Sequence, residues 1–383
     1  MNSARNFLLI WNRMGDYHRA RWNALVRENQ KGTNSGGQVC TADLGAGDSL
    51  YNWENTAEST GYFLLSKKPV SQPDWYNRVK NFWQLVTSQS IQVVCIAGYG
   101  QPEYLFFIVL SKLLGKKVIL FAESWYAGNT ITDKLKGLFI KLFCHGILAS
   151  GKRAKNHFSK RLGFPEHKIK TGYSVVDNEH FAQVVAPSQT EAIKQSLFLK
   201  ALLSIQSEED AAPVLLCVAR FASEKNLNML IRAFQESQLV NDWQLVLVGG
   251  GPEEDNLKQA IHSDAVTLLP WQPYELLPAL YQQASCFILP STFEPWGLVV
   301  NEAMAAGLPV IVSEQCGCVP ELVNDNNGFT FDAEKKESLV RVFNQLANYS
   351  THELKSMGNH STSIVQQYSP ATWAESILTL AGK

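Results

Sequence analysis

A regular alternation of short apolar runs and helical segments constrains the fold of this chain more than any other feature. From residue 213 onward, each run rich in Val, Ile and Leu is followed by an amphipathic segment of about ten residues. The runs are VLLCVA at 214–219, WQLVLVG at 243–249, VTLLP at 266–270, CFILP at 286–290 and PVIVS at 309–313. This alternation is typical of βαβ units, so it predicts a parallel sheet with helices on both faces.

The first half of the chain shows the same pattern less regularly. Its candidate strands are FLLIW at 7–11, QVVCIAG at 92–98, KVILFA at 117–122 and GILAS at 146–150. A chain of 383 residues also exceeds what one hydrophobic core usually organises. We therefore predict an α/β protein of two Rossmann-like domains. The predicted boundaries are a first domain at 1–180, a linker at 181–190, a second domain at 191–366 and a last helix at 367–383.

Charge is divided unequally between the two halves. Residues 1–180 carry 23 Lys and Arg against 13 Asp and Glu, whereas the remainder carries 11 against 22. The basic half is expected to face something anionic, such as membrane headgroups or an acidic acceptor. Nucleic acid is not expected, because no recognition motif accompanies the charge.

Apolar runs and cysteines indicate the compartment. The longest apolar stretches, such as YLFFIVL at 104–110, fall short of the roughly 18 to 20 residues that span a bilayer. The apolar core near the N-terminus is too short for a secretory signal. Seven cysteines without CxxC spacing favour a reducing cytoplasm and no disulfide framework. We therefore expect a cytoplasmic protein, with membrane association left open.

Two cations follow the strand at 214–219. Arg220 and Lys225 bracket the loop in CVARFASEKNL, where open α/β sheets bind ligands. The fork of an arginine and the point charge of a lysine together suit a diphosphate. The alternative is a pair of ordinary surface cations.

Glycines follow the next strand. Gly250 and Gly251 lie in LVLVGGGPEEDNL, where they let a ligand approach the backbone closely. The stretch is not the GxGxxG of a dinucleotide site, and no acidic residue ends the following strand. An NAD site is therefore not expected.

Two glutamates flank a turn in STFEPWGLVVNEAMAAG at 291–307. Pro295 and Gly297 allow a sharp turn that leaves amides near Gly297 and Leu298 free to face an anion. Glu294 and Glu302 would lie on either side of a phosphate bound there. Carboxylates accept hydrogen bonds from vicinal hydroxyls, so each could hold one sugar of a nucleotide sugar.

The stretches VARFASEKNL, VLVGGGPEEDNL and FEPWGLVVNEAMAAGLPVIVS together resemble retaining GT-B glycosyltransferases of family 4, with their Glu-x7-Glu signature. The resemblance implies that Arg220 and Lys225 hold the donor diphosphate, Glu294 the transferred sugar and Glu302 the ribose. It places further donor contacts at Gly250, Gly251, Trp271, Pro295, Trp296, Gly297 and Leu298.

The resemblance also implies a GT-B fold, with an interdomain cleft and a last helix that crosses back to the first domain. In retaining members the acceptor attacks the face from which the leaving group departs, and a donor phosphate oxygen takes the proton. Fixed cations and helix-end amides would stabilise the growing negative charge of the leaving group. No Asp-x-Asp pair occurs in the sequence, which argues against a metal ion in this role. No other cofactor is expected either.

Acceptor-side candidates come from strand ends in the first half. They are Gly15, Asp16 and His18 after the first strand, Tyr99 after the second and Glu123 after the third. Asp16 equally suits the start of a helix, and Tyr99 equally suits packing. The match to the family is thin here, because only Gly15 stands where many relatives have two glycines.

The stretch TDKLKGLFIKLFCHG at 132–146 has two interpretations. Leu135, Leu138 and Leu142 share one side with Phe139 and Phe143, and lysines lie nearby. The helix could lie on an anionic membrane, but the favoured prediction is that its apolar side covers the sheet.

The function predicted from the sequence is therefore retaining transfer of a sugar from a UDP- or GDP-sugar to a glycan or lipid-linked acceptor, in cell-surface polysaccharide or glycoconjugate synthesis. One alternative is a sugar-nucleotide epimerase or a phosphorylase on the same fold. Another is an inactive sugar-binding regulatory protein.

Overall fold

The computed structural model describes residues 5–31, 37–47, 60–126, 128–183 and 212–382. The chain divides into two compact units. The first comprises residues 1–176 and 368–383, and the second comprises residues 177–367.

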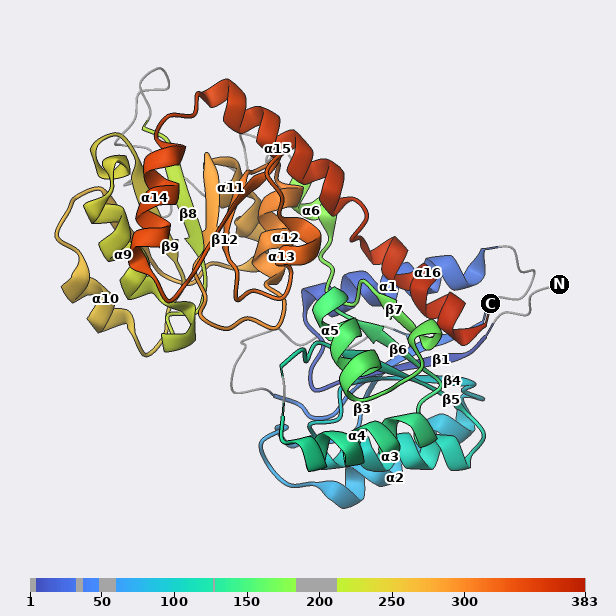
Figure 1. The fold of residues 1–383 in the computed structure, drawn as a ribbon. Helices are drawn as coiled ribbons and strands as arrows, with labels where there is room; N and C mark the ends of the chain where they lie inside the picture. The colour runs from blue at the N-terminus through green and yellow to red at the C-terminus, as the bar shows by residue number, and fades with distance from the viewer. Residues whose placement is uncertain (1–4, 32–36, 48–59, 127, 184–211, 383) are drawn as a thin grey trace. The chain divides into compact units, whose positions relative to one another are not determined.

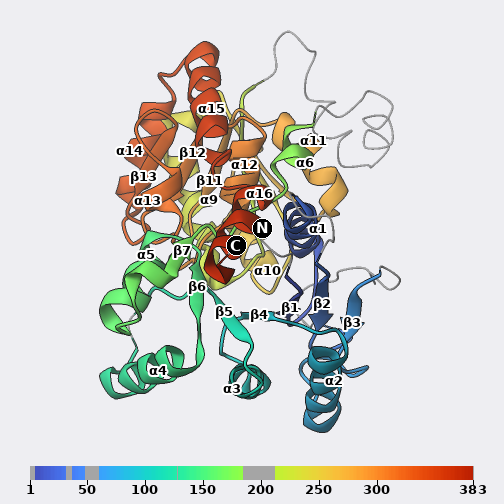
Figure 2. The same ribbon diagram turned by 90° about the vertical axis from the view of Figure 1, so that its right-hand side faces the viewer.

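The first unit is built on a parallel sheet of seven strands in the order β3-β2-β1-β4-β5-β6-β7 (Figure 1 and Figure 2). Its strands are β1 (Phe7–Trp11), β2 (Val39–Asp43), β3 (Tyr62–Leu64), β4 (Val93–Ala97), β5 (Lys117–Ala122), β6 (Gly146–Ala149) and β7 (Ile169–Thr171). Its α-helices are α1 (Asp16–Gln30), α2 (Trp75–Ser88), α3 (Pro102–Leu113), α4 (Thr130–Phe143), α5 (Lys152–Asn156) and α16 (Pro370–Ala381). A π-helical turn, His157–Arg161, follows α5.

Alternation along β1 shows why this sheet is covered on both sides. Phe7 and Leu9 pack in the cluster that includes Trp373 of α16, whereas Leu8 and Ile10 pack in the cluster that includes Phe107 of α3. Successive residues of a strand point to opposite faces, so a strand that is apolar throughout needs a helical layer on each side. α1 and α16 form one layer, and α2, α3 and α4 form the other (Figure 2).

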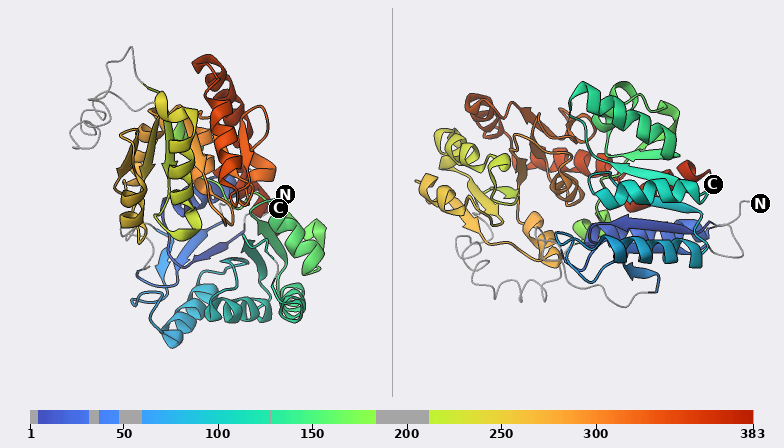
Figure 3. Two further views of the ribbon diagram at one scale, coloured as in Figure 1. Left: turned by 60° about the vertical axis from the view of Figure 1, so that its left-hand side comes forward. Right: turned by 90° about the horizontal axis from the view of Figure 1, so that it is seen from below.

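The second unit is built on a parallel sheet of six strands in the order β10-β9-β8-β11-β12-β13. Its strands are β8 (Val214–Val218), β9 (Gln244–Val248), β10 (Val266–Leu269), β11 (Cys286–Leu289), β12 (Val310–Ser313) and β13 (Gly328–Phe331). Its α-helices are α6 (Asn178–Ala182), α9 (Leu227–Glu236), α10 (Glu254–Ala260), α11 (Leu277–Gln282), α12 (Leu298–Ala305), α13 (Val319–Leu322), α14 (Lys336–Leu346) and α15 (Thr351–Val365). Helices lie on both faces of this sheet too (Figure 3).

The units confirm the predicted fold class of two parallel α/β domains. The last helix, α16, belongs to the first unit, where it packs on α1. The chain passes to the second unit between Val176 and Asp177, a few residues before the predicted linker at 181–190. That segment begins in α6, which packs on α11 and α12, and its residues 184–190 lie outside the described residues. Within the described chain, every helix is too short or too polar to cross a bilayer.

Candidate functional site

The order of strands in the second sheet reverses between β8 and β11, which lie next to each other. Loops that leave neighbouring strands in opposite directions open a crevice at their carboxyl ends, where open α/β sheets bind ligands. The loop after β8 carries Arg220 and Lys225, and the loop after β11 carries Glu294. The structure therefore brings the three predicted catalytic residues to one edge of the sheet.

An ion pair between Lys225 and Glu294 joins these two loops. Lys225 ends a 3-10 turn, Ser223–Lys225, and its Nζ donates to Oε2 of Glu294. The two side chains are 18% and 16% exposed, so the pair is neither buried nor free in solvent. Part of each charged side chain therefore still meets solvent.

Arg220 is bound within its own loop. Its Nη2 donates to Oε1 of Glu224 at 2.7 Å, and half of its side chain is exposed. That hydrogen bond is the main reason why the pKa of Glu224 lies below its usual value. The backbone oxygen of Glu224 also accepts from the N–H of Thr292 at 2.9 Å. Glu224, which was not predicted as a site residue, thus links the β8 and β11 loops.

The turn after β12 holds the loop that carries Glu294. The N–H of Gly317 donates to the carbonyl of Glu294 at 2.9 Å, and that of Cys318 donates to the carbonyl of Trp296 at 3.2 Å. Trp296 is buried, and its ring N–H donates to Oδ1 of Asn301 at 2.8 Å. Trp296 was expected to contact a donor, but the structure places it inside the unit, where it fixes the loop.

A glycine sets the start of α12. Gly297 has φ +105°, which favours glycine, and a Cβ built there would lie 2.8 Å from a methyl of Leu289. Leu298 then begins the helix, and both Leu298 and Pro295 are partly exposed. The first amides of a helix have no partner within it and attract anions, so this end of α12 suits a phosphate.

Glu302 lies deeper than the sequence suggests. It is fully buried in α12, and its Oε2 accepts from the hydroxyl of Tyr281 at 2.7 Å. Tyr281 belongs to α11, whose apolar pattern gives no sign of this contact. The two glutamates predicted to hold the sugars of the donor therefore differ, since the Glu294 side chain is partly exposed and Glu302 is fully buried.

The glycine loop after β9 packs tightly against the loop after β8. Gly251 has φ +153°, and a Cβ built there would lie 2.5 Å from the carbonyl oxygen of Phe221. Beside it, a Cβ built on Gly250 would meet open space. Trp271, which follows β10, has 63% of its surface exposed. The loops after β8, β9, β10 and β11 thus bring the predicted donor contacts to one edge of the sheet.

In the first unit, three acceptor-side candidates follow β1. Gly15 precedes α1, and its N–H donates to Nδ1 of His18 at 3.1 Å. The ring of His18 lies 4.8 Å from that of Trp11, and burial is the main reason why the pKa of His18 is well below its usual value. His18 is therefore a neutral hydrogen-bond acceptor near pH 7. Asp16 starts α1 and pairs loosely with Arg19 at 3.8 Å.

The other two candidates follow β4 and β5. The ring of Tyr99 packs edge-on against Phe158, and burial raises the pKa of its hydroxyl. Tyr99 therefore lies at the carboxyl end of β4 and also packs against its neighbours in the unit. Glu123 accepts from the hydroxyl of Ser174 at 2.9 Å.

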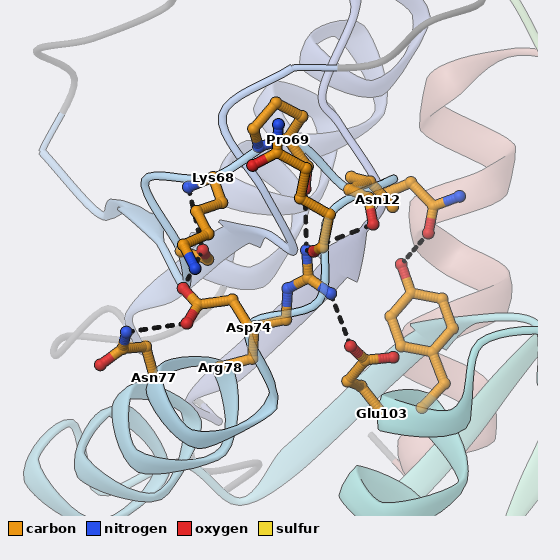
Figure 4. Close-up of polar contacts among 11 residues, drawn as sticks. Asn12, Lys68, Pro69, Asp74, Asn77, Arg78 and Glu103 are labelled. Carbon is orange, nitrogen blue, oxygen red and sulfur yellow. Dashed lines mark hydrogen bonds and ion pairs between the residues drawn. The ribbon is translucent and has the colours of Figure 1, made fainter.

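Sequence reasoning missed two polar residues in the first unit, Asn12 and Asp43. Asn12, just after β1, accepts from the hydroxyl of Tyr104 in α3 at 2.7 Å (Figure 4). Asp43 ends β2, is buried, and accepts from the hydroxyl of Tyr62 at 2.9 Å. Burial raises the pKa of Asp43 to about 6. An acid at the carboxyl end of a short strand is a usable signal, but β2 itself was not predicted.

Comparison with known proteins shows which proteins this chain resembles in sequence. Residues 202–362 match the family model for glycosyl transferases group 1. An uncharacterised glycosyltransferase of Methanocaldococcus jannaschii is 26% identical over 198 residues, which are 51% of this chain and 48% of the relative. The amylovoran biosynthesis glycosyltransferase of Erwinia amylovora is 28% identical over 229 residues, 57% of this chain and 51% of the relative.

Likeness in fold extends further than likeness in sequence. The HepE protein of Anabaena, solved with UDP and glucose, superposes with a TM-score of 0.71 at 15% identity, over 99% of this chain and 100% of that one. By contrast, the chain spans about half the length of the curated relatives described above. Residues 202–362 thus resemble group 1 glycosyl transferases in sequence, and the chain has the GT-B fold of glycosyltransferases of known structure.

Proposed function

We propose that this protein is a retaining glycosyltransferase that uses a nucleotide diphosphate sugar as donor. The observation that carries the proposal is the Lys225–Glu294 ion pair at the strand-order reversal of the second sheet, beside the start of α12. These groups match the parts of such a donor. The cation and the amides at the start of α12 suit the diphosphate. The carboxylate suits the hydroxyls of the sugar.

The ion pair also suggests how binding would proceed. Without donor, the ammonium of Lys225 neutralises Glu294, so neither charge is left alone in a half-buried place. A diphosphate would take over Lys225, and Arg220 could turn to it from Glu224. Glu294 would then be released to accept hydrogen bonds from the sugar.

The chemical step follows from these charges. The acceptor hydroxyl oxygen forms a bond to the anomeric carbon while the bond from that carbon to the phosphate oxygen breaks, and the hydroxyl proton passes to the departing phosphate. Lys225, Arg220 and the α12 amides would stabilise the charge that grows on the nucleoside diphosphate. Attack on the face that the leaving group vacates retains the configuration.

Further features of the proposal concern the family, the donor base, the acceptor and the metal. The spacing of Glu294 and Glu302 supports membership of family 4. Glu302 would then bind the ribose after Tyr281 of α11 releases its hydrogen bond to that carboxylate. The UDP bound by the Anabaena protein favours a uridine donor, and the Erwinia relative favours a polysaccharide acceptor. The missing Asp-x-Asp pair supports transfer without a metal ion.

Substitution of Glu294 provides the test. Glu294→Gln keeps the shape of the side chain but removes its charge, and we expect release of nucleoside diphosphate from UDP-, GDP- or ADP-sugars, with glycan acceptors present, to fall about 100-fold or more. Glu236→Gln removes a carboxylate of the same unit that pairs with Lys336 at 2.6 Å, away from the site, and should leave the rate unchanged.

Two results would contradict the proposal. One is a Glu294→Gln variant as active as the wild type. The other is a product whose anomeric configuration, read by nuclear magnetic resonance, is opposite to that of the donor. Activity lost in EDTA and restored by a divalent ion would overturn only the metal-free part.

A further inference from the structure

Large hydrophobic side chains are exposed mainly on one layer of the first unit. Thirteen such side chains are more than about a third exposed among the described residues. Ten of them lie on α2, α3 and α4: Trp75, Tyr76, Trp83, Leu105, Phe106, Leu113, Ile131, Leu135, Leu138 and Leu142. Single exposed apolar residues are ordinary, but a contiguous group marks a binding surface. We call this surface the α2–α4 face.

The helix α4 shows that the exposure is built in. Ile131, Leu135, Leu138 and Leu142 follow the spacing of one helical side, and each is 56–71% exposed. The opposite side is fixed to the unit, because Gly137 lies against the carbonyl of Leu162 so closely that a Cβ would be 2.2 Å from it. The prediction that the apolar side of this helix covers the sheet is therefore wrong for its leucines, whereas Phe139 and Phe143 do pack against the core cluster.

Aromatic residues extend the face across the neighbouring helices. The three helices lie side by side beneath the sheet in Figure 2, and α3 packs on both α2 and α4. The rings of Trp75 in α2 and Phe106 in α3 meet edge-on at 5.4 Å. The ammonium of Lys80 lies 6.0 Å from the centre of the Tyr76 ring. Tryptophan and tyrosine are the side chains enriched where membranes meet water.

The charge on this face has one sign. The three helices carry five exposed lysines: Lys80, Lys112, Lys134, Lys136 and Lys141. They contain two carboxylates, and both are turned inward. Glu103 is buried in an ion pair with Arg78 at 2.6 Å (Figure 4), and Asp133 is buried in an ion pair with Arg161. Asp74, just before α2, accepts hydrogen bonds from Ser66 and Asn77.

We propose that the α2–α4 face binds the surface of an anionic lipid bilayer. A surface of leucines and aromatic rings flanked by lysines fits such a bilayer, because the apolar side chains enter the interface while the lysines reach the headgroups. A second copy fits less well, since a symmetric contact would bring the same lysines together. The inference goes beyond the proposed function and does not depend on it, because lipid binding is measured without a donor.

Co-sedimentation with vesicles tests the proposal. The full chain should sediment with vesicles of phosphatidylcholine and 30% phosphatidylglycerol, should stay in solution with phosphatidylcholine alone, and should be released by salt. Lys134→Gln with Lys136→Gln should weaken binding about 25-fold, at about fivefold for each lysine. Leu135→Ser with Leu138→Ser should abolish it. Both leucines are exposed, so the fold should survive.

Matched substitutions in the second unit show whether binding depends on the lysines of the α2–α4 face or only on the total positive charge of the protein. Lys258→Gln with Lys355→Gln removes two exposed lysines there and should leave vesicle binding unchanged. A fluorophore that reports polarity, placed through Leu138→Cys, should shift to the blue on anionic vesicles, whereas one at Thr351→Cys should not.

Three outcomes would overturn the proposal. The first is no sedimentation with anionic vesicles at low salt. The second is equal loss of binding in the second-unit control. The third is a dimer seen by light scattering that disappears in Leu135→Ser with Leu138→Ser while vesicles fail to bind, since that would assign the face to a second copy of the chain.

Discussion

The two units share the same order of strands, but each contains an ion pair that differs from the other in position and exposure. In both sheets the order begins 3-2-1-4-5-6 when strands are counted along the unit, with a reversal between the first and fourth. The first unit holds Arg78–Glu103 within a helical layer, with side chains 3% and 9% exposed. The second holds Lys225–Glu294 in loops at the reversal, where both side chains stay partly open. The buried position of Arg78–Glu103 suits a pair that supports the fold. The partly exposed position of Lys225–Glu294 suits a pair that exchanges partners when the proposed donor binds.

Hydrogen bonding strengthens this contrast. Besides Glu103, the guanidinium of Arg78 donates to the carbonyls of Pro69, Val70 and Gln72, so it ties a whole loop to α2. At the reversal of the first sheet the linking contact is neutral, between Asn12 and Tyr104. The linking contact at the reversal is therefore a neutral hydrogen bond in the first unit and an ion pair in the second.

The largest expected effect comes from breaking the buried Arg78–Glu103 ion pair. Arg78→Ala leaves Glu103 charged and buried and frees three carbonyls, so the free energy of unfolding of the first unit should fall by about 3–5 kcal/mol. Denaturant titration followed by circular dichroism measures the change. Lys336→Ala, which breaks the exposed pair with Glu236, should cost less than about 1 kcal/mol. Equal losses in the two variants would show that burial does not separate these pairs.

A smaller effect concerns Asp43 and pH. Its pKa is raised to about 6 by burial, whereas in the unfolded chain it should be near 3.8. The folded state therefore favours the protonated acid, a contribution that is complete below about pH 4 and is lost as pH rises through 6. Asp43→Asn should remove this loss, and its stability relative to the wild type should rise by up to about 3 kcal/mol between pH 4 and 7. A relative stability that does not change with pH would contradict the buried, uncharged environment of Asp43.

The sequence predicted the helical and strand pattern where strands are central and apolar. The edge strands β3, β7 and β13 are short, and β2 (Val39–Asp43) includes Thr41 and ends in an acid, so none shows an apolar run. Periodicity also identified the leucine stripe of α4 correctly but could not tell whether it faces a core or solvent.

For the site, the sequence placed Arg220, Lys225 and Glu294 on loops at one sheet edge, because parallel topology fixes that edge. It could not show that Lys225 pairs with Glu294, 69 residues away, or that Tyr281 encloses Glu302. Nor could it show that the ring of Trp296 is buried, because an aromatic beside Pro and Gly indicates a loop but not the direction in which its ring points.

Binding of a nucleoside diphosphate tests the central claim most directly. UDP, GDP or ADP should raise the unfolding temperature of the wild type, by an amount that grows with ligand concentration. Lys336→Ala should respond as the wild type does, whereas Lys225→Ala, with a similar unfolding temperature in the absence of ligand, should respond little. A Lys225→Ala variant that is stabilised as strongly as the wild type would contradict the assignment of this ion pair to the donor site.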